Sequence, residues 1–140
     1  MSEAGFDDRT QESGYEPPRS AEEILRRYAA GERVFRDADL PEGSSFRGAT
    51  LAGAIFKEAM LHSVDFRGAD LRGVQFVNSN VKCSDFRSAD LWDAVFTGTS
   101  VEATFWEGAN VVGADFAEAF FHGSPIRDPE FPFGKFGGRA

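Results

Sequence analysis

Several residue types that mark common protein classes are scarce in this chain of 140 residues. A single cysteine excludes an intrachain disulfide framework and favours a reducing, cytoplasmic location. No apolar run approaches the roughly 18 residues of a membrane span, and residues 1–14 lack the basic and apolar regions of a signal peptide. Lysine and arginine number 15 against 23 aspartates and glutamates, so the net charge of −8 argues against a basic nucleic-acid-binding face. We therefore expect neither direct nucleic-acid binding nor membrane association.

Most of the aromatic residues are phenylalanine: the chain has 15 phenylalanines but only two tyrosines and two tryptophans. Phenylalanine has no polar group that needs a partner, so most of these rings are expected in a hydrophobic core. The length fits a single domain. The spacing of the rings shows how one domain accommodates them.

Large apolar residues recur at every fifth position over most of the chain, which fits neither a strand nor a helix and identifies an internal repeat. These central residues are Phe46, Leu51, Phe56, Leu61, Phe66, Leu71, Phe76, Val81, Phe86, Leu91, Phe96, Val101, Trp106, Val111, Phe116, Phe121 and Ile126. The residue two places earlier is never larger than valine, which predicts a second inward position that is tightly confined. Glycine often follows two places after the centre, as expected of a turn with positive φ.

The repeat resembles that of the pentapeptide-repeat family, whose unit is Ala, then Asp or Asn, then Leu or Phe, then two variable residues. The clearest copies begin at Ala69, Ala89, Ala109 and Ala114. The resemblance covers residues 33–126 and implies an all-β solenoid, a right-handed quadrilateral β-helix of about five coils with four repeats in each. A unit of five residues cannot bury its own large side chain. Coils of four units solve this, because residue n then lies over residue n+20 at about the 4.8 Å strand spacing.

Stacking at this interval sorts the core into ladders. Two phenylalanine-rich ladders should face each other across the core, separated by ladders of leucine and valine. One holds Phe46, Phe66, Phe86, Trp106 and Ile126, and the other holds Phe56, Phe76, Phe96 and Phe116. Phe35 and Leu40 are expected in an earlier turn. Because Leu40 and Phe46 are six residues apart, the segment 41–43 should bulge outward.

Three segments lie outside the repeats. Residues 1–18 are polar and acidic and predict a disordered leader. Residues 19–32 predict a short helix that starts after Ser20 with a capping box to Glu23, and that caps the solenoid because it is too short to stand alone. Residues 127–140 form a tail rich in aromatic residues, glycine and proline. Its aromatic residues are expected to fold back on the last coil, and they are Phe131, Phe133 and Phe136.

Charged residues at outward positions form columns along the solenoid. One column contains Arg47, Arg67 and Arg87, and the column beside it contains Asp65 and Asp85. The first interpretation is a self-neutralising ladder that adds little stability, and the second is an anion-binding stripe. A further acidic column contains Asp70 and Asp90, where an outward Asp or Asn is the family's solvated, turn-supporting residue.

The acidic balance supports an alternative function through the family resemblance. Some pentapeptide-repeat proteins are acidic rods that mimic B-form DNA and bind DNA gyrase. Residues 33–126 carry eight lysines and arginines against 13 aspartates and glutamates. The resemblance therefore implies, as the alternative, a DNA mimic that protects or inhibits a topoisomerase. The shortness of the rod and the arginine column weaken this interpretation.

Apolar residues at outward positions are the most specific candidates for function. Trp92 and Val112 share a column, and Phe105 and Phe120 occupy outward positions of the last coils. An exposed patch of this size is unusual on a monomer. Either the tail covers it, or it binds a partner protein or a second copy, with a homodimer forming through the C-terminal end.

No catalytic, cofactor or metal site is expected. His62 and His122 share a column but lie three coils, about 14 Å, apart, which is too far for one metal ion. Cys83 has no histidine in its own coil and is expected to be an inert, at least half-buried thiol. A convex rod offers no cleft. The sequence therefore predicts a non-catalytic interaction or scaffold module that presents a rigid rod surface to a protein partner.

Overall fold

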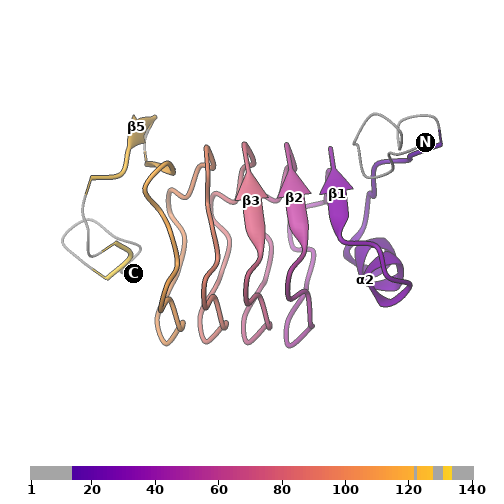
Figure 1. The fold of residues 1–140 in the computed structure, drawn as a ribbon, viewed down its shortest axis with the longest axis horizontal. Coiled ribbons are helices and arrows are strands. Elements are labelled where there is room, and N and C mark those ends of the chain that lie inside the picture. The colour runs from indigo at the N-terminus through magenta and orange to yellow at the C-terminus, as the bar shows by residue number, and fades with distance from the viewer. Residues whose placement is uncertain (1–13, 122, 128–130, 134–140) are drawn as a thin grey trace.

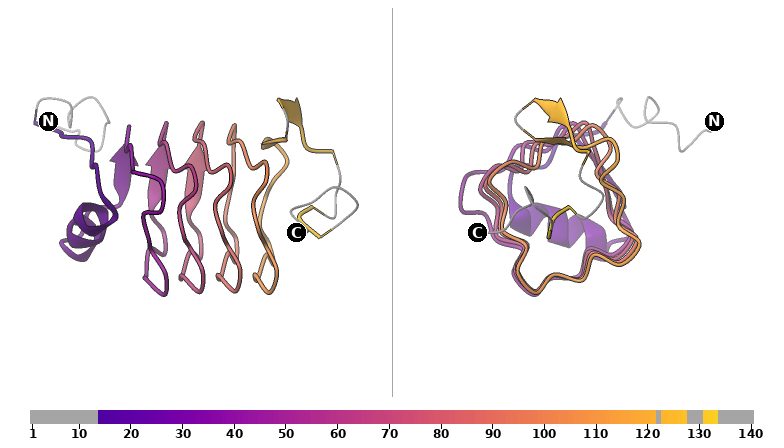
Figure 2. Two further views of the ribbon diagram at one scale, coloured as in Figure 1. Left: turned by 180° about the vertical axis from the view of Figure 1, so that it is seen from behind. Right: turned by 90° about the vertical axis from the view of Figure 1, so that its left-hand side faces the viewer.

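The computed structural model describes residues 14–121, 123–127 and 131–133. A stack of coils makes up most of this region, and one helix lies at its N-terminal end (Figure 1). Viewed along the stack, the coils superpose in a single, roughly four-sided outline (Figure 2). The named elements are α2 (Ala21–Ala29), β1 (Val34–Arg36), β2 (Ile55–Lys57), β3 (Gln75–Val77), β4 (Phe120–Phe121) and β5 (Ser124–Pro125).

The coils pair in parallel at the interval that the repeat predicts. Strands β1, β2 and β3 form one parallel sheet, and isolated bridges such as Asp65 to Asp85 continue the interval of twenty residues along the stack. Between the first two coils the interval is one residue longer, because Asp39 pairs with Met60 whereas Ser45 pairs with Asp65. The extra residue thus lies within the segment where the bulge was predicted. The β-helix is confirmed.

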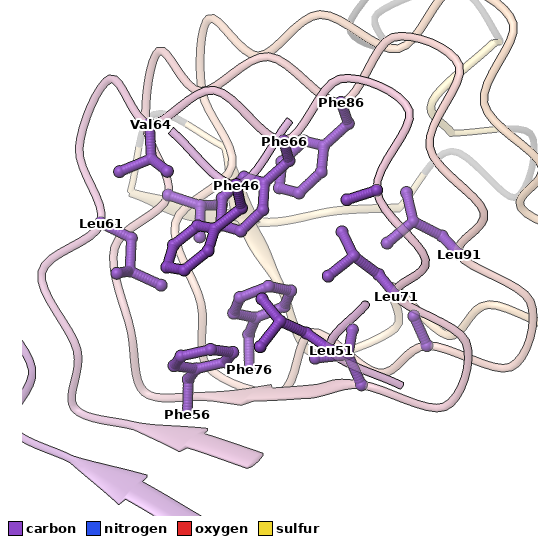
Figure 3. Close-up of a cluster of buried hydrophobic side chains, with 14 of the residues drawn as sticks. Phe46, Leu51, Phe56, Leu61, Val64, Phe66, Leu71, Phe76, Phe86 and Leu91 are labelled. Carbon is purple, nitrogen blue, oxygen red and sulfur yellow. The ribbon is translucent and has the colours of Figure 1, made fainter. Parts of the chain in front are cut away.

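The core contains the two aromatic ladders that the spacing predicts, together with leucine and valine side chains (Figure 3). Along the ladder from Phe46 to Trp106, ring centroids are 4.7–5.3 Å apart and the rings are stacked. The opposite ladder runs from Phe35 to Phe116 with centroids 4.8–5.6 Å apart. Between the ladders the rings meet edge to face at 5.5–6.3 Å. Stacking within ladders and edge contacts between them are both favoured by the ring quadrupoles, so the excess of phenylalanine is architectural.

Hydroxyl groups at the small inward positions join neighbouring coils. The Ser84 Oγ donates to the carbonyl of Leu61 at 2.7 Å and accepts the amide proton of Val64 at 3.0 Å. The single tryptophan of the core, Trp106, donates its indole N–H to Thr104 Oγ1 at 2.6 Å. These polar groups are buried with partners, so they do not incur the desolvation cost of an unsatisfied hydrogen-bonding group.

From Gly48 to Gly113, the turn position two residues after the repeat centre has the left-handed backbone conformation that was predicted. Gly73 has φ 68°, and non-glycine residues such as Ala103 and Cys83 adopt φ values of 57° and 62° at the same position. Cys83 occupies this turn and is exposed. The prediction of a buried or half-buried thiol is therefore wrong, because turn residues point away from the core.

Helix α2 lies across the N-terminal end of the stack (Figures 1 and 2). Ser20 Oγ accepts the amide proton of Glu23 at 3.0 Å, and the Glu23 carboxylate accepts the amide proton of Arg19 at 3.1 Å. Ile24 is fully buried and belongs to the same core cluster as the ladders. The Tyr28 hydroxyl donates to the carbonyl of Ala52 at 2.7 Å. The predicted helix is confirmed.

The segment before the helix is ordered over part of its length. The Tyr15 hydroxyl donates to the Arg36 carbonyl at 2.9 Å, and it accepts the Arg36 amide proton at 2.7 Å. The carbonyl of Pro18 accepts the amide proton of Asp39 at 3.2 Å. The prediction of disorder is therefore wrong for residues 14–18, because Tyr15 bonds to the edge of the first coil. Residues 1–13 lie outside the described part of the chain.

At the other end of the stack, the tail residue Phe131 packs against the aromatic ladders. Phe131 is buried and contacts Trp106 and Phe116 edge to face, at centroid distances of 5.8 and 5.0 Å. Phe133 is 44% exposed, and Phe136 lies outside the described residues. The predicted fold-back is thus confirmed for Phe131 and wrong for Phe133.

Candidate protein interface

The arginine and aspartate columns pair with each other. Arg67 donates from Nε and Nη2 to the two carboxylate oxygens of Asp65, both at 3.0 Å, and its Nε lies 3.6 Å from Asp85 Oδ2 in the next coil. Arg87 holds Asp85 in the same way, with Nη2 2.6 Å from Oδ2. A shallow groove follows the arginine column and is lined by Arg47, Gly48, Arg67, Gly68, Arg87 and Ser88. The aspartates thus compensate the positive charge that an anion-binding stripe would need.

The same pairing lowers carboxyl pKa values. Hydrogen bonds from Arg67 hold the pKa of Asp65 below its ordinary value of 3.8, and Arg72 does the same for the pKa of Asp70. The pKa of Asp85 is also lowered, because the hydrogen bonds from Arg87 outweigh its burial, which acts in the opposite direction. Asp90 has no such arginine, since Trp92 occupies the equivalent position in its coil.

Acidification is expected to weaken the solenoid through these pairs. A carboxyl whose pKa is lowered by folding stabilises the fold above its unfolded pKa, and this contribution disappears as the pH falls through the folded pKa. Urea unfolding at pH 6 and at pH 2.5 should therefore show a loss of stability in the wild type. The Asp70→Asn and Arg72→Gln variants should each lose slightly less, because an exposed ion pair contributes little to stability. Equal losses in all three proteins would contradict this assignment.

The candidate apolar residues are exposed, but they do not form one patch. Trp92 is 49% exposed, Val112 65% and Phe105 38%, whereas Phe120 is half-buried in β4. Trp92 and Val112 occupy equivalent positions of successive coils, and the amide of Asp93 donates to the carbonyl of Val112 at 2.9 Å. Phe105 and Phe120 lie on other faces, where they pair with Asp85 and Ser100. The described part of the tail leaves Trp92 and Val112 uncovered.

Charge along the solenoid is divided in a way that the repeat pattern alone does not reveal. All eight lysines and arginines of residues 33–126 precede Ser88, and none occurs from Ser88 to Ile126. This second stretch carries six acidic residues, which are Asp90, Asp93, Glu102, Glu107, Asp115 and Glu118. The loss of positive charge is visible in single columns, where Arg72 is followed by the uncharged Trp92 and Arg87 by the acidic Glu107. Counting charge column by column would have revealed it.

Asp90 and Asp93 border the exposed pair on its own coil. Asp90 Oδ1 accepts the amide proton of Trp92 at 3.2 Å and a side-chain proton of Asn110 at 2.9 Å. Asp93 lies in the turn after Trp92 with φ 58°. Its carboxylate lies so close to Gly113 that a Cβ added there would collide with Oδ1. We call Trp92, Val112, Asp90 and Asp93 the Trp92 surface.

The described residues contain neither a cluster of metal-binding side chains nor a membrane-spanning helix. Within them, no group of three or more His, Cys, Asp or Glu side chains could hold a metal ion. His62 Nδ1 lies 3.2 Å from a Glu42 oxygen and 3.1 Å from Ser63 Oγ, while His122 lies outside the described residues. No described helix has the length and apolar character to cross a bilayer.

Comparison with known proteins identifies the repeat. The family model described as pentapeptide repeats (8 copies) matches residues 34–73 and 61–93. No protein of curated function matches the chain.

Similar solved structures include a pentapeptide repeat protein (Rfr23) from the cyanobacterium Cyanothece 51142, at 21% identity over 68% of this chain and 60% of that one, with a TM-score of 0.49. The pentapeptide repeat protein alr5209 from Nostoc Pcc 7120 is 22% identical over 81% of this chain and 91% of that one, with a TM-score of 0.45. QnrB1, a plasmid-mediated fluoroquinolone resistance protein, is 20% identical over 64% of this chain and 70% of that one, with a TM-score of 0.40. Residues 34–93 of this chain thus match the sequence model of the pentapeptide-repeat family.

Proposed function

We propose that this chain is a non-catalytic protein-binding module and that the Trp92 surface is its binding site. The observation that carries the proposal is the exposure of Trp92 and Val112 side by side on a solenoid whose other large apolar side chains are mostly buried. Tryptophan is the residue type most enriched among those that dominate binding energy at protein interfaces.

The scaffold favours binding because it is already ordered. The Trp92 amide donates to Asp90 Oδ1 at 3.2 Å, and the Trp92 carbonyl accepts the amide proton of Gly73 at 2.8 Å. Leu91, the preceding residue, is fully buried in the core. The backbone at Trp92 is thus held from two coils, so a partner does not have to order it on binding.

The alternative of a gyrase-binding DNA mimic requires a continuous negative surface. In the coils that precede Ser88, arginines pair with Asp65, Asp70 and Asp85 and interrupt that surface. Only the later coils are free of basic residues. The paired columns therefore favour the protein-binding module. Formation of a homodimer through the C-terminal end stays a prediction.

Selection from a random 12-residue peptide library displayed on phage tests the proposal. The intact chain should enrich a set of binding peptides, and Trp92→Ala should weaken their binding by about tenfold or more, as expected when an interface tryptophan is removed. Met60→Ala is the matched control, because Met60 is 48% exposed and lies at an outward position on another face. It should leave binding unchanged. No enrichment, or equal loss in both variants, would contradict the proposed function.

A further inference from the structure

Several aromatic rings outside the ladders are covered by arginine. The guanidinium carbons of Arg27 and Arg36 lie 5.2 and 4.5 Å from the centroid of the Tyr15 ring. Arg33 lies 3.8 Å from the centroid of Tyr28, and Arg87 lies 5.6 Å from that of Phe105. All four distances are within the range of a cation–π interaction. In this chain, arginine is the recurrent partner of rings at the surface.

Trp92 departs from this pattern. Its indole is the strongest cation–π acceptor among the side chains, and about half of it is exposed. No arginine or lysine of the described residues lies over its ring. Arg72, its neighbour in the column toward the N-terminus, is held by Asp70 through two hydrogen bonds of 2.7 Å. On the other side the column continues with Val112, which carries no charge. The ring face is therefore available to a cation from outside.

The charges around Trp92 favour the same ligand. Asp90 and Asp93 lie next to Trp92 on its coil, and neither forms an ion pair within the described part of the chain. Beyond Arg87 the sequence supplies no lysine or arginine until Arg127. A ring with a negative face next to two carboxylates attracts a guanidinium or ammonium group and repels an acidic one.

We propose that the Trp92 surface binds a basic segment of a partner protein. An arginine or lysine of that segment stacks on the Trp92 ring and pairs with Asp90 and Asp93, while an apolar neighbour packs on Val112. A second copy of this chain does not fit this site as well, because each copy carries a net charge of −8. In addition, Arg67, Arg72 and Arg87 are engaged by aspartates of their own chain. This inference rests on the proposed function and specifies the partner's chemistry.

The peptides selected on phage separate the two proposals. If the inference holds, peptides whose binding depends on Trp92 will be enriched in arginine and lysine relative to the starting library. Neutral or acidic peptides that depend on Trp92 would leave the binding function standing and overturn the basic partner. A selection without Trp92-dependent peptides would overturn the binding function itself.

A defined peptide pair tests the contact with Trp92 directly. The probes are acetyl-Gly-Arg-Leu-Arg-Leu-Gly-amide and its analogue with citrulline, the neutral isostere, in place of both arginines. Binding is followed by the indole N–H signal of Trp92 in NMR spectra, since the other tryptophan, Trp106, is buried in the core. The wild type should bind the arginine peptide at least about tenfold more tightly than the citrulline peptide, as expected of a cation–π contact supported by two carboxylates.

Two sets of variants identify the source of this preference. Trp92→Leu keeps an apolar side chain without a π system and should reduce the preference for arginine severalfold. Asp90→Asn combined with Asp93→Asn should do the same, whereas the distant control pair Asp37→Asn and Asp39→Asn, both exposed in the first coil, should retain it. Equal affinity of the two peptides for the wild type, or an unchanged preference in Trp92→Leu, would overturn the proposal.

Discussion

Substitution of Phe76 by lysine is expected to unfold the solenoid. Phe76 is fully buried and stacks between Phe56 and Phe96, at centroid distances of 5.5 and 5.0 Å. It also meets Phe66 and Phe86 edge to face at 6.1 and 6.3 Å. Loss of a buried phenylalanine costs about 3–5 kcal/mol, and an unpaired charge in a dry interior costs several more. The sum approaches the roughly 5–15 kcal/mol by which domains of this size are stable.

Circular dichroism and urea unfolding measure the effect. Gln75→Lys is the matched control, because Gln75 is the exposed neighbour in β3 and its side chain points to the opposite side of the strand. This variant should unfold within about 0.5 kcal/mol of the wild type. Phe76→Leu preserves an apolar core and should remain folded with a loss of about 1–2 kcal/mol. A Phe76→Lys protein with the wild-type unfolding midpoint would contradict the inward register of the whole repeat.

The interior of this fold could be predicted from sequence because its contacts repeat at a fixed interval. Once Phe56 and Phe76 are one coil apart, Phe96 and Phe116 must follow, and the structure places all four in one ladder. Even the longer first coil is visible in the spacing from Leu40 to Phe46. Each repeat thus provides an independent indication of the same inward register.

The ends of the solenoid could not be predicted in this way because their contacts occur once. Tyr15 is ordered by bonds to the backbone of Arg36, and nothing in the polar leader indicates that contact. Phe131 enters the core while Phe133, two residues later, is exposed. Periodicity does not distinguish between them, because the tail lies outside the repeats.

The candidate site could be predicted from the sequence only in part. The outward positions of Trp92 and Val112 follow from the repeat, and the structure confirms that both are exposed. Their separation from Phe105 also follows from the register, because each outward column belongs to one face. Whether arginine covers a ring depends on side-chain conformation, so the difference between Phe105, which Arg87 covers, and Trp92 required the structure.

Substitution of Ile24 by aspartate is expected to detach α2 and expose the N-terminal end of the core. Ile24 is fully buried within the core cluster, whereas most of the helix is partly or fully exposed. A helix of nine residues is not stable in water without such packing. Burial of a carboxylate at this position, together with loss of the isoleucine, should cost about 3–5 kcal/mol. In a solenoid each coil is stabilised by its neighbours, so the first coil should be affected most.

Hydrogen exchange locates the effect of this variant. The amides of Asp37 and Phe46, which bond to the carbonyls of Lys57 and Asp65, should exchange faster in Ile24→Asp. The amide of Asp85, which bonds to the carbonyl of Val64 in the middle of the stack, should retain more of its protection. Glu22→Asp alters an exposed position of the same helix and should preserve the helical circular dichroism that Ile24→Asp loses. Retention of that signal in Ile24→Asp, together with a first coil that stays protected, would refute the role of α2 as the cap that completes the core. The first coil would then have to be stable with an uncovered apolar end.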